Sequence, residues 1–127
     1  MGGTTIAGTV VLAAAAGIRV LATGGLGGVH RGSERSMDVS ADLTELGRTN
    51  MAVVCSGSKA FLDLPRTLEF LETQGVYVGT FGEPPAAEYP AFYSRGCGLA
   101  SPSVVRDAQE AASIICVPRP SVRGRTR

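Results

Sequence analysis

The 127-residue sequence contains no tryptophan, only three cysteines and a single lysine among its twelve basic residues. Cys55, Cys97 and Cys116 are odd in number and have no CxxC spacing, so they argue against a disulfide framework and favour a reducing compartment. The apolar stretch 6–16 is too short to cross a bilayer and lacks the basic flank of a signal peptide. We therefore expect a soluble cytoplasmic protein without a membrane partner, with an organelle as the alternative location in a eukaryote.

The charge is unevenly distributed along the chain, although the formal net charge is only +1. A hydrophobic content of 44% and a charged content of 18% are typical of a globular domain. Residues 116–127 carry four arginines and no acidic residue, with little apolar surface. The sequence therefore predicts one domain over residues 1–115, followed by an arginine-rich disordered tail over 116–127 that is solvated and does not bind nucleic acid.

Helical and strand-like segments alternate along the domain. Helices are predicted from a threonine cap to residue 16, over 42–48 with a capping box from Asp42 and Glu45, over a stretch from 61 to 75 that contains Pro65, and over 106–115. Strands are predicted over 18–23, 51–56 and 76–81, with a short fourth strand over 91–93. This alternation indicates an α/β fold, a three-layer α/β/α sandwich around a largely parallel sheet.

The single lysine, Lys59, follows the second predicted strand in the run Met51-Ala-Val-Val-Cys-Ser-Gly-Ser-Lys59. Ligands of parallel α/β sheets bind beyond the carboxyl ends of the strands, which is where this residue falls. A lysine amine can lose its proton and attack a carbonyl, whereas arginine stays charged. The pattern favours a catalytic lysine, and the alternative is the chance survival of one lysine in an arginine-rich composition.

Residues 24–32 form a glycine-rich loop after the first predicted strand. His30 occupies the third glycine position of a dinucleotide fingerprint, and no lysine completes a phosphate-binding P-loop, so neither site is expected. The glycines would let backbone N–H groups approach an anion, or they would simply form a tight crossover turn. His30 is a candidate general acid or base, with an idle loop histidine as the alternative.

Three oxygen-bearing side chains alternate in Asp38-Val-Ser40-Ala-Asp42. In an extended segment they would point the same way and could bind a hard cation or sugar hydroxyls. Alternatively, Asp42 caps the next helix while Asp38 is solvated.

Four runs of the sequence, taken together, resemble the pseudouridine-5′-phosphate glycosidases, a family that includes the indigoidine synthase A-like proteins. They are Gly3-Thr-Thr-Ile6, Ala22-Thr-Gly-Gly-Leu-Gly-Gly-Val-His-Arg-Gly32, Asp38-Val-Ser-Ala-Asp-Leu43 and Val53-Val-Cys-Ser-Gly-Ser-Lys59. The resemblance extends over residues 2–115 and also includes Thr67-Leu-Glu-Phe-Leu-Glu-Thr73 and Pro90-Ala-Phe-Tyr93. It implies that the chain holds the central part of a larger glycosidase fold.

The resemblance implies reversible cleavage of the C–C glycosidic bond of pseudouridine 5′-phosphate to uracil and ribose 5-phosphate. The matched positions would take the following roles: Lys59 forms a Schiff base with the opened sugar, Asp38 binds a divalent metal, typically Mn²⁺, and Ile6, Ser40, Ala41 and Asp42 bind substrate. Thr23 and His30 would lie near the active site. The neutral lysine is the reactive form, so we expect burial or positive charge around it. The family also implies a homotrimer.

The family further implies a proton-donating glutamate and a second substrate-binding lysine, which precede the matched region and have no counterpart in this sequence. Two alternatives therefore stand beside the active enzyme. One is an inactive fragment that retains phosphate-sugar or metal binding. The other is a general nucleotide-binding module, against which the broken glycine fingerprint speaks.

Overall fold

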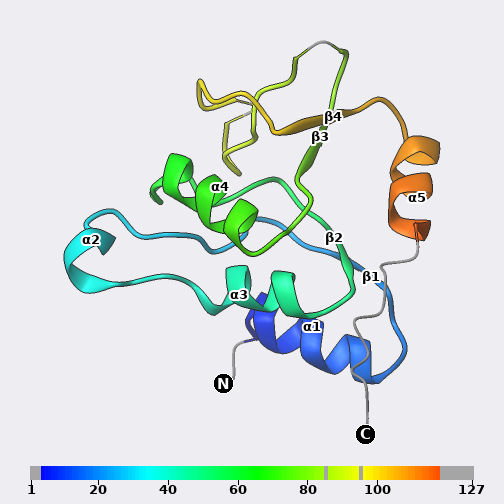
Figure 1. Ribbon diagram of the computed structural model, residues 1–127, viewed down its shortest axis with the longest axis horizontal. Coiled ribbons are helices and arrows are strands. Elements are labelled where there is room, and N and C mark those ends of the chain that lie inside the picture. The colour runs from blue at the N-terminus through cyan, green and yellow to red at the C-terminus, as the bar shows by residue number, and fades with distance from the viewer. Residues whose placement is uncertain (1–3, 85, 95, 118–127) are drawn as a thin grey trace, which may run out of the picture.

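The computed structural model describes residues 4–84, 86–94 and 96–117. Parallel strands form two pairs in these ranges: β1 (Val20–Ala22) with β2 (Ala52–Val54), and β3 (Gly79–Phe81) with β4 (Ser103–Val105). Both parallel pairs confirm the predicted α/β class. The expected single sheet is instead two separate two-stranded sheets within the described ranges, which Figure 1 shows at different levels of the molecule.

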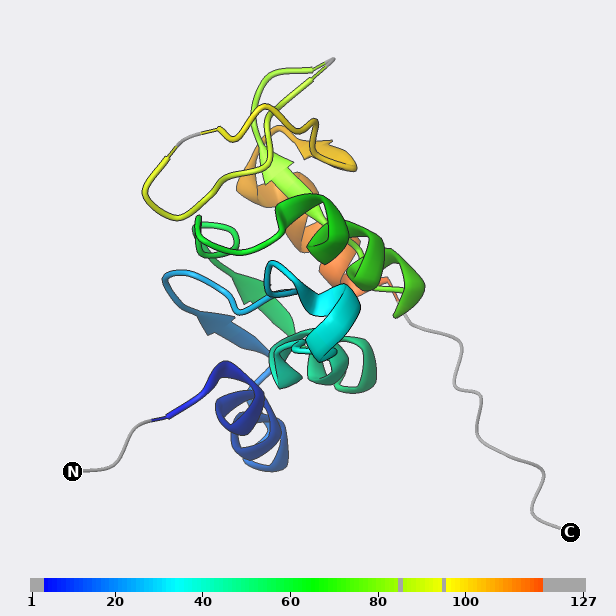
Figure 2. The same cartoon turned by 90° about the vertical axis from the view of Figure 1, so that its left-hand side faces the viewer.

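Five helices are present in the described part of the chain: α1 (Ile6–Ala15), α2 (Ser33–Ser36), α3 (Ala41–Arg48), α4 (Leu64–Thr73) and α5 (Ala108–Cys116). The expected N-cap of α1 is confirmed, since the Thr5 side chain accepts a hydrogen bond from the Gly8 N–H. Pro65 lies in the first turn of α4, where its missing N–H costs nothing, so it begins this helix and does not interrupt it. Figures 1 and 2 show α1 and α3 together at one end of the molecule.

Three expectations about the elements were wrong. The N-cap of α3 is Ser40, which accepts from the Asp42 N–H, so Asp42 neither caps this helix nor forms a capping box with Glu45. Residues 91–93 make only an isolated bridge from Ala91 to Gly57, whereas 103–105 form an unexpected strand. The predicted tail overlaps α5 at Cys116, and its residues 118–127 lie outside the described residues.

The main core lies where the glycine-rich loop, α3 and α4 meet. Its buried members come from all three elements and are Leu26, Val29, Leu43, Leu46 and Leu71. A second, smaller cluster of Leu62, Leu64 and Ala91 lies under the segment that follows Lys59. Burying these side chains fixes the loop against the two helices, because each contributes about 1.5–3 kcal/mol when it leaves water.

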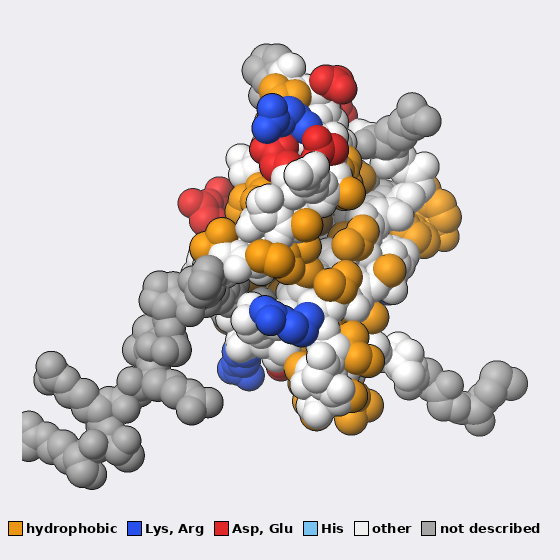
Figure 3. All heavy atoms as spheres, turned by 90° about the vertical axis from the view of Figure 1, so that its right-hand side faces the viewer, with side chains coloured by type: hydrophobic (Ala, Val, Ile, Leu, Met, Phe, Trp, Pro, Cys, Tyr) orange, Lys and Arg blue, Asp and Glu red, His pale blue; other side chains and the backbone are white. Residues whose placement is uncertain are grey.

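One face of the molecule remains apolar and uncovered. Figure 3 shows hydrophobic side chains gathered on the side that carries α5 and the β1–β2 pair. Exposed large apolar residues in these elements and the segments beside them include Ile18, Val20, Val54, Ile115 and Val117. Within the described ranges, none of the helices combines the length and hydrophobicity that crossing a bilayer requires.

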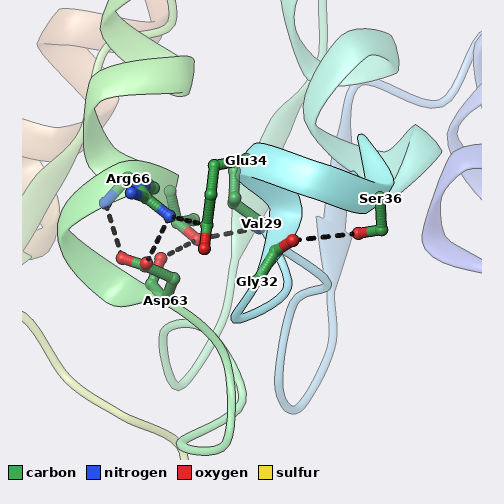
Figure 4. A network of polar contacts seen from close by, with 7 residues as sticks. Val29, Gly32, Glu34, Ser36, Asp63 and Arg66 are labelled. Atoms are coloured by element: carbon green, nitrogen blue, oxygen red, sulfur yellow. Dashed lines mark hydrogen bonds and ion pairs between the residues drawn. The ribbon is translucent and has the colours of Figure 1, made fainter.

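Residues 28–40, called here the loop 28–40, extend away from the main core between Val29 and Val39, and α4 holds this loop in place. The Val29 N–H donates to Thr67 Oγ1 at 2.9 Å, and the Thr67 hydroxyl donates to the Asp63 carbonyl at 2.7 Å. Arg66 lies 2.5 Å from Glu34 and 3.4 Å from Asp63 (Figure 4). Because Thr67 is fully buried while the ion pairs are exposed, the buried hydroxyl is the stronger part of the anchor.

Replacing Thr67 by valine should lower the free energy of unfolding by about 1–3 kcal/mol, because it leaves the buried Val29 N–H without an acceptor. Thr73→Val is the matched control, since its hydroxyl also donates four residues back along α4, to Glu69, but on the exposed surface. Urea unfolding of both variants measures the difference. Equal stabilities of the two variants would contradict the anchoring role.

Candidate functional site

Lys59 lies in the turn between β2 and α4, and the glycine-rich loop holds its backbone. Its N–H donates to the Leu26 carbonyl at 3.1 Å, and its carbonyl accepts from the Leu62 N–H at 3.1 Å. Leu26 and Ser58 also form a parallel bridge. The Lys59 side chain is exposed, so of the two expected surroundings, burial or positive charge, burial is not found in the described part of the chain.

Gly25 lies between the side chains of Lys59 and Phe92. A Cβ atom at Gly25 would be 3.0 Å from Lys59 Cγ and 2.9 Å from Phe92 Cγ, so both side chains approach the bare backbone closely. Phe92 has a φ of 62°, a left-handed conformation that is unusual for an aromatic residue. The glycine-rich loop thus supplies the surface against which the lysine stem and this ring pack.

His30 and Asp38 face one another near the two ends of the loop 28–40. The His30 N–H donates to the Asp38 carbonyl at 3.0 Å, and His30 Nδ1 lies 3.8 Å from Asp38 Oδ2. The His30 ring is 5.8 Å from the Phe61 ring, which lies two residues after Lys59. This contact connects the histidine to the Lys59 turn.

The described residues offer few groups that could bind a metal ion. Asp38 is exposed, and no group of three His, Cys, Asp or Glu side chains that could hold an ion occurs in ranges 4–84, 86–94 and 96–117. A hard cation can be held by one carboxylate if waters complete its coordination shell. Asp38 fits that mode of binding, and His30 Nδ1 lies 3.8 Å from its carboxylate.

Asp42 joins two elements that were predicted to bind substrate. Its buried carboxylate accepts from the Ala7 N–H at 2.9 Å and from the Gly27 N–H at 3.0 Å. A Cβ atom at Gly27 would be 2.2 Å from Ser40 Oγ, so this position needs glycine. Ile6, Ser40, Ala41 and Asp42 therefore gather where the first turns of α1 and α3 meet the loop.

Thr23 directly follows β1 and continues its pairing, because its N–H donates to the Val54 carbonyl at 2.9 Å. It precedes Gly24 and Gly25, and the Phe92 ring packs closely against the backbone of both glycines. The structure thus brings Thr23, the glycine-rich loop and the Lys59 turn to the same carboxyl end of the β1–β2 pair, as the alternation of elements predicted.

A cavity beside the Lys59 turn is not lined by Lys59. It has a volume of about 360 Å³ and is lined by Arg31, Leu62, Asp63, Leu64, Pro65, Cys97 and Leu99. Because its lining is largely apolar and Lys59 lies on the open surface beside it, the contacts of Lys59 define the candidate site better than the cavity does.

Segment 89–92 contacts the lysine turn. The Tyr89 hydroxyl lies 2.8 Å from Ser58 Oγ, and the Phe92 N–H donates to the Ser56 carbonyl at 2.8 Å. Sequence periodicity carries no signal for such pairing, because the contacting residues are about thirty positions apart in irregular segments. The apolar character of Tyr89, Ala91 and Phe92 was the available hint.

Alkaline pH should destabilise this region. Burial raises the pKa of the Cys55 thiol above its ordinary 9.0 and that of Tyr89 above its ordinary 10.0. The unfolded chain therefore loses these protons first, so the stabilisation is complete below pH 9 and declines as pH rises through the folded-state values. Urea unfolding from pH 8 to 11 should show this decline. A Cys55→Ala/Tyr89→Phe variant should show a flatter profile, and an unchanged slope would refute the assignment.

The sequence and the fold are similar to those of known proteins. Residues 1–121 match the family described as indigoidine synthase A like protein. The chain is 61% identical to a pseudouridine-5′-phosphate glycosidase of Chloroflexus aurantiacus, over 87% of this chain and 35% of the relative. It is 53% identical to a pseudouridine-metabolizing bifunctional protein of Schizosaccharomyces pombe, over 94% of this chain and 18% of the relative.

Two solved structures share the fold. The prealnumycin C-glycosynthase AlnA, solved in complex with ribulose 5-phosphate, superposes with a TM-score of 0.82 at 40% identity, covering 90% of this chain and 36% of that chain. An indigoidine synthase A-like protein of Thermotoga maritima gives a TM-score of 0.77 at 38% identity, covering 88% and 36%. The chain thus spans about a third of these proteins and of the Chloroflexus glycosidase. From the match over nearly its whole length and the shared fold, the chain belongs to the indigoidine synthase A-like family.

Proposed function

We propose that this chain carries the nucleophilic part of a pseudouridine-5′-phosphate glycosidase, with Lys59 as the residue that forms a Schiff base with the sugar. The observation that carries the proposal is the position of the only lysine. It lies in a turn clamped by the glycine-rich loop, at the end of the parallel strands where α/β proteins bind ligands. The name of the Chloroflexus relative, which is 61% identical, supports this reaction.

The reaction is most easily written in the direction of synthesis. The neutral amine of Lys59 attacks C1 of the open aldehyde form of ribose 5-phosphate, and loss of one water gives the imine. Carbon 5 of uracil then adds to the imine carbon and loses its proton. Closure of the ring by the C4 hydroxyl displaces the lysine amine, so ribose 5-phosphate and uracil give pseudouridine 5′-phosphate and water.

Cleavage follows the same steps backwards. The lysine amine first displaces the ring oxygen at C1, which opens the ribose and leaves the C4 hydroxyl. The nitrogen lone pair then forms the C=N bond while the C–C bond breaks, and the electron pair of the C–C bond remains on the base, which takes up a proton at carbon 5. Water then hydrolyses the imine to ribose 5-phosphate and the free amine. The proton donor in the family is a glutamate that precedes the matched region. Within this chain, His30 is a candidate, because its ring lies 5.8 Å from the ring of Phe61 in the Lys59 turn.

Substrate binding is proposed for Ile6, Ser40, Ala41 and Asp42. They lie at the first turns of α1 and α3, whose N-terminal N–H groups favour an anion such as the sugar phosphate. Both oxygens of Asp42 already accept backbone hydrogen bonds, so we propose that it shapes this region and that Ser40 and Ala41 meet the ligand.

A divalent cation, typically Mn²⁺, is proposed at Asp38. When bound, such an ion would supply positive charge near the sugar phosphate. One exposed carboxylate with His30 at 3.8 Å supports only a largely hydrated ion, so the Asp38 side chain would hold the ion through its waters as much as directly.

We further propose that the complete enzyme works as a cytoplasmic homotrimer. The uncovered apolar face over α5 and the β1–β2 pair supports association, since apolar patches of this kind usually contact another chain or further parts of the same chain (Figure 3). Three free thiols, at Cys55, Cys97 and Cys116, suit a reducing compartment.

Turnover tests the proposal directly. The chain is incubated with ribose 5-phosphate, uracil and Mn²⁺, and pseudouridine 5′-phosphate is measured by liquid chromatography. The reverse reaction is followed through release of uracil. Product in both directions supports the glycosidase, and its absence together with the absence of any covalent adduct at Lys59 would contradict it.

A second function is favoured by the length of the chain, which spans about a third of its glycosidase relatives and holds one lysine only. It is an inactive piece of the enzyme that retains binding of the sugar phosphate or the metal. Calorimetry with ribose 5-phosphate, with and without Mn²⁺, identifies this case, since it predicts heat of binding without turnover.

A further inference from the structure

Ser58 and Tyr89 form a buried hydroxyl pair directly beside the candidate nucleophile. They are 31 residues apart in the sequence, and their oxygens are separated by 2.8 Å. Ser58 has no exposed surface and Tyr89 is 4% exposed. The proposed reaction assigns neither hydroxyl a role.

The tyrosine is held firmly on its own side of this contact. Its N–H donates to the Leu99 carbonyl at 2.8 Å, and the Cys97 thiol donates to its carbonyl at 3.1 Å. Burial raises the pKa of the Tyr89 hydroxyl, which therefore stays protonated at neutral pH and can donate to Ser58. A satisfied buried pair of this kind fixes one arrangement, because breaking it would leave a polar group without a partner.

The serine passes this restraint to the lysine through the backbone. Gly57 forms an antiparallel β-bridge with Ala91. The carbonyl of Gly57 accepts a hydrogen bond from the Leu26 N–H at 2.8 Å, and the Lys59 N–H donates to the Leu26 carbonyl. Residues 56–59 are therefore clamped between the glycine-rich loop on one side and segment 89–92 on the other. The Ser58–Tyr89 bond is the side-chain link in this clamp.

We infer that the Ser58–Tyr89 hydroxyl pair positions Lys59, fixing the turn so that its exposed amine points at the opened sugar. The inference rests on the proposed function. The exposed Lys59 side chain loses conformational entropy when its amine reacts. A rigid turn lowers that cost, because a fixed Lys59 backbone restricts the positions that the amine can occupy before the reaction. The pair touches no substrate and acts only through the backbone of Lys59.

The test compares Tyr89→Phe and Ser58→Ala with the parent chain. Each variant is incubated with ribose 5-phosphate and cyanoborohydride, and the rate of adduct formation at Lys59 is measured by mass spectrometry across sugar concentrations. We expect the rate at saturating sugar to fall about tenfold in either variant, with the half-saturating concentration unchanged. Thr49→Val is the control: it removes a half-buried hydroxyl bond to Glu45 at the far end of α3 and should keep the parent rate.

A second readout does not depend on the sugar. Because Lys59 is the only lysine, reductive ¹³C-methylation labels one side chain besides the N-terminus. We expect its NMR signal to move towards that of free dimethyl-lysine in both variants and to stay in place in Thr49→Val. An unmoved signal, or a rate equal to that of the parent, would overturn the positioning role. If the parent chain itself forms no adduct, the proposed function fails, and the NMR signal still decides the inference.

Discussion

Replacing Lys59 by arginine is expected to abolish covalent attachment of ribose 5-phosphate to the chain. Arginine keeps the charge and length of the side chain but has no amine that can lose its proton and form an imine. Removing the nucleophile of an enzyme costs several powers of ten in rate, so we expect a fall of more than about a thousandfold. Borohydride reduction followed by intact-protein mass spectrometry measures the adduct.

The control moves the lysine to another place. In the double variant Lys59→Arg/Arg48→Lys the chain again has one lysine, now at the exposed end of α3. We expect it to remain unlabelled on the time scale on which the parent is labelled, because its position lacks the clamp of the glycine-rich loop. Equal labelling of this variant would show that any surface lysine reacts, and the role assigned to Lys59 would be wrong.

The largest effect on stability is expected for Gly57→Ala. Gly57 has a φ of +81°, and an added Cβ would be only 1.7 Å from the Pro90 carbonyl oxygen. The left-handed backbone costs about 1–2 kcal/mol with alanine, and displacing segment 89–92 adds about 1–3 kcal/mol. We expect a loss of about 2–5 kcal/mol in the free energy of unfolding, measured by urea titration.

Gly17→Ala separates the two causes of that loss. Gly17 has nearly the same φ, +78°, but no atom lies within 4 Å of the added Cβ. This variant should lose only the cost of the left-handed backbone, about 1–2 kcal/mol. If Gly57→Ala were no less stable than Gly17→Ala, the close approach of segment 89–92 to the lysine turn would be refuted.

The sequence predicted those parts of the structure that depend on local pattern. Caps and glycine stops indicated α1, and the apolar runs indicated β1 and β2, because such signals act between neighbours in the chain. The placement of Lys59 at the end of a parallel strand followed from the alternation of elements. The strand 103–105 was missed, since Pro102 and the serines around it obscure a run with only two valines.

Long-range contacts of polar groups could not be predicted. Asp42 was expected to cap α3 or to join Asp38 in a polar cluster, but its carboxylate instead connects α1 to the glycine-rich loop. The Ser58–Tyr89 pair likewise joins two irregular segments. Hydroxyl and carboxyl groups can form hydrogen bonds with many different donors and acceptors. Their spacing along the chain therefore does not determine which hydrogen-bond partner they have in the folded protein.

One measurement tests the central claim most directly: borohydride reduction of the parent chain with ribose 5-phosphate, followed by peptide mass spectrometry. The proposed chemistry predicts the reduced sugar phosphate on the peptide that contains Lys59, with the N-terminal amine unlabelled at short times. An unmodified Lys59 under saturating sugar, in a chain shown to be folded by circular dichroism, would contradict the claim that this turn presents a reactive amine.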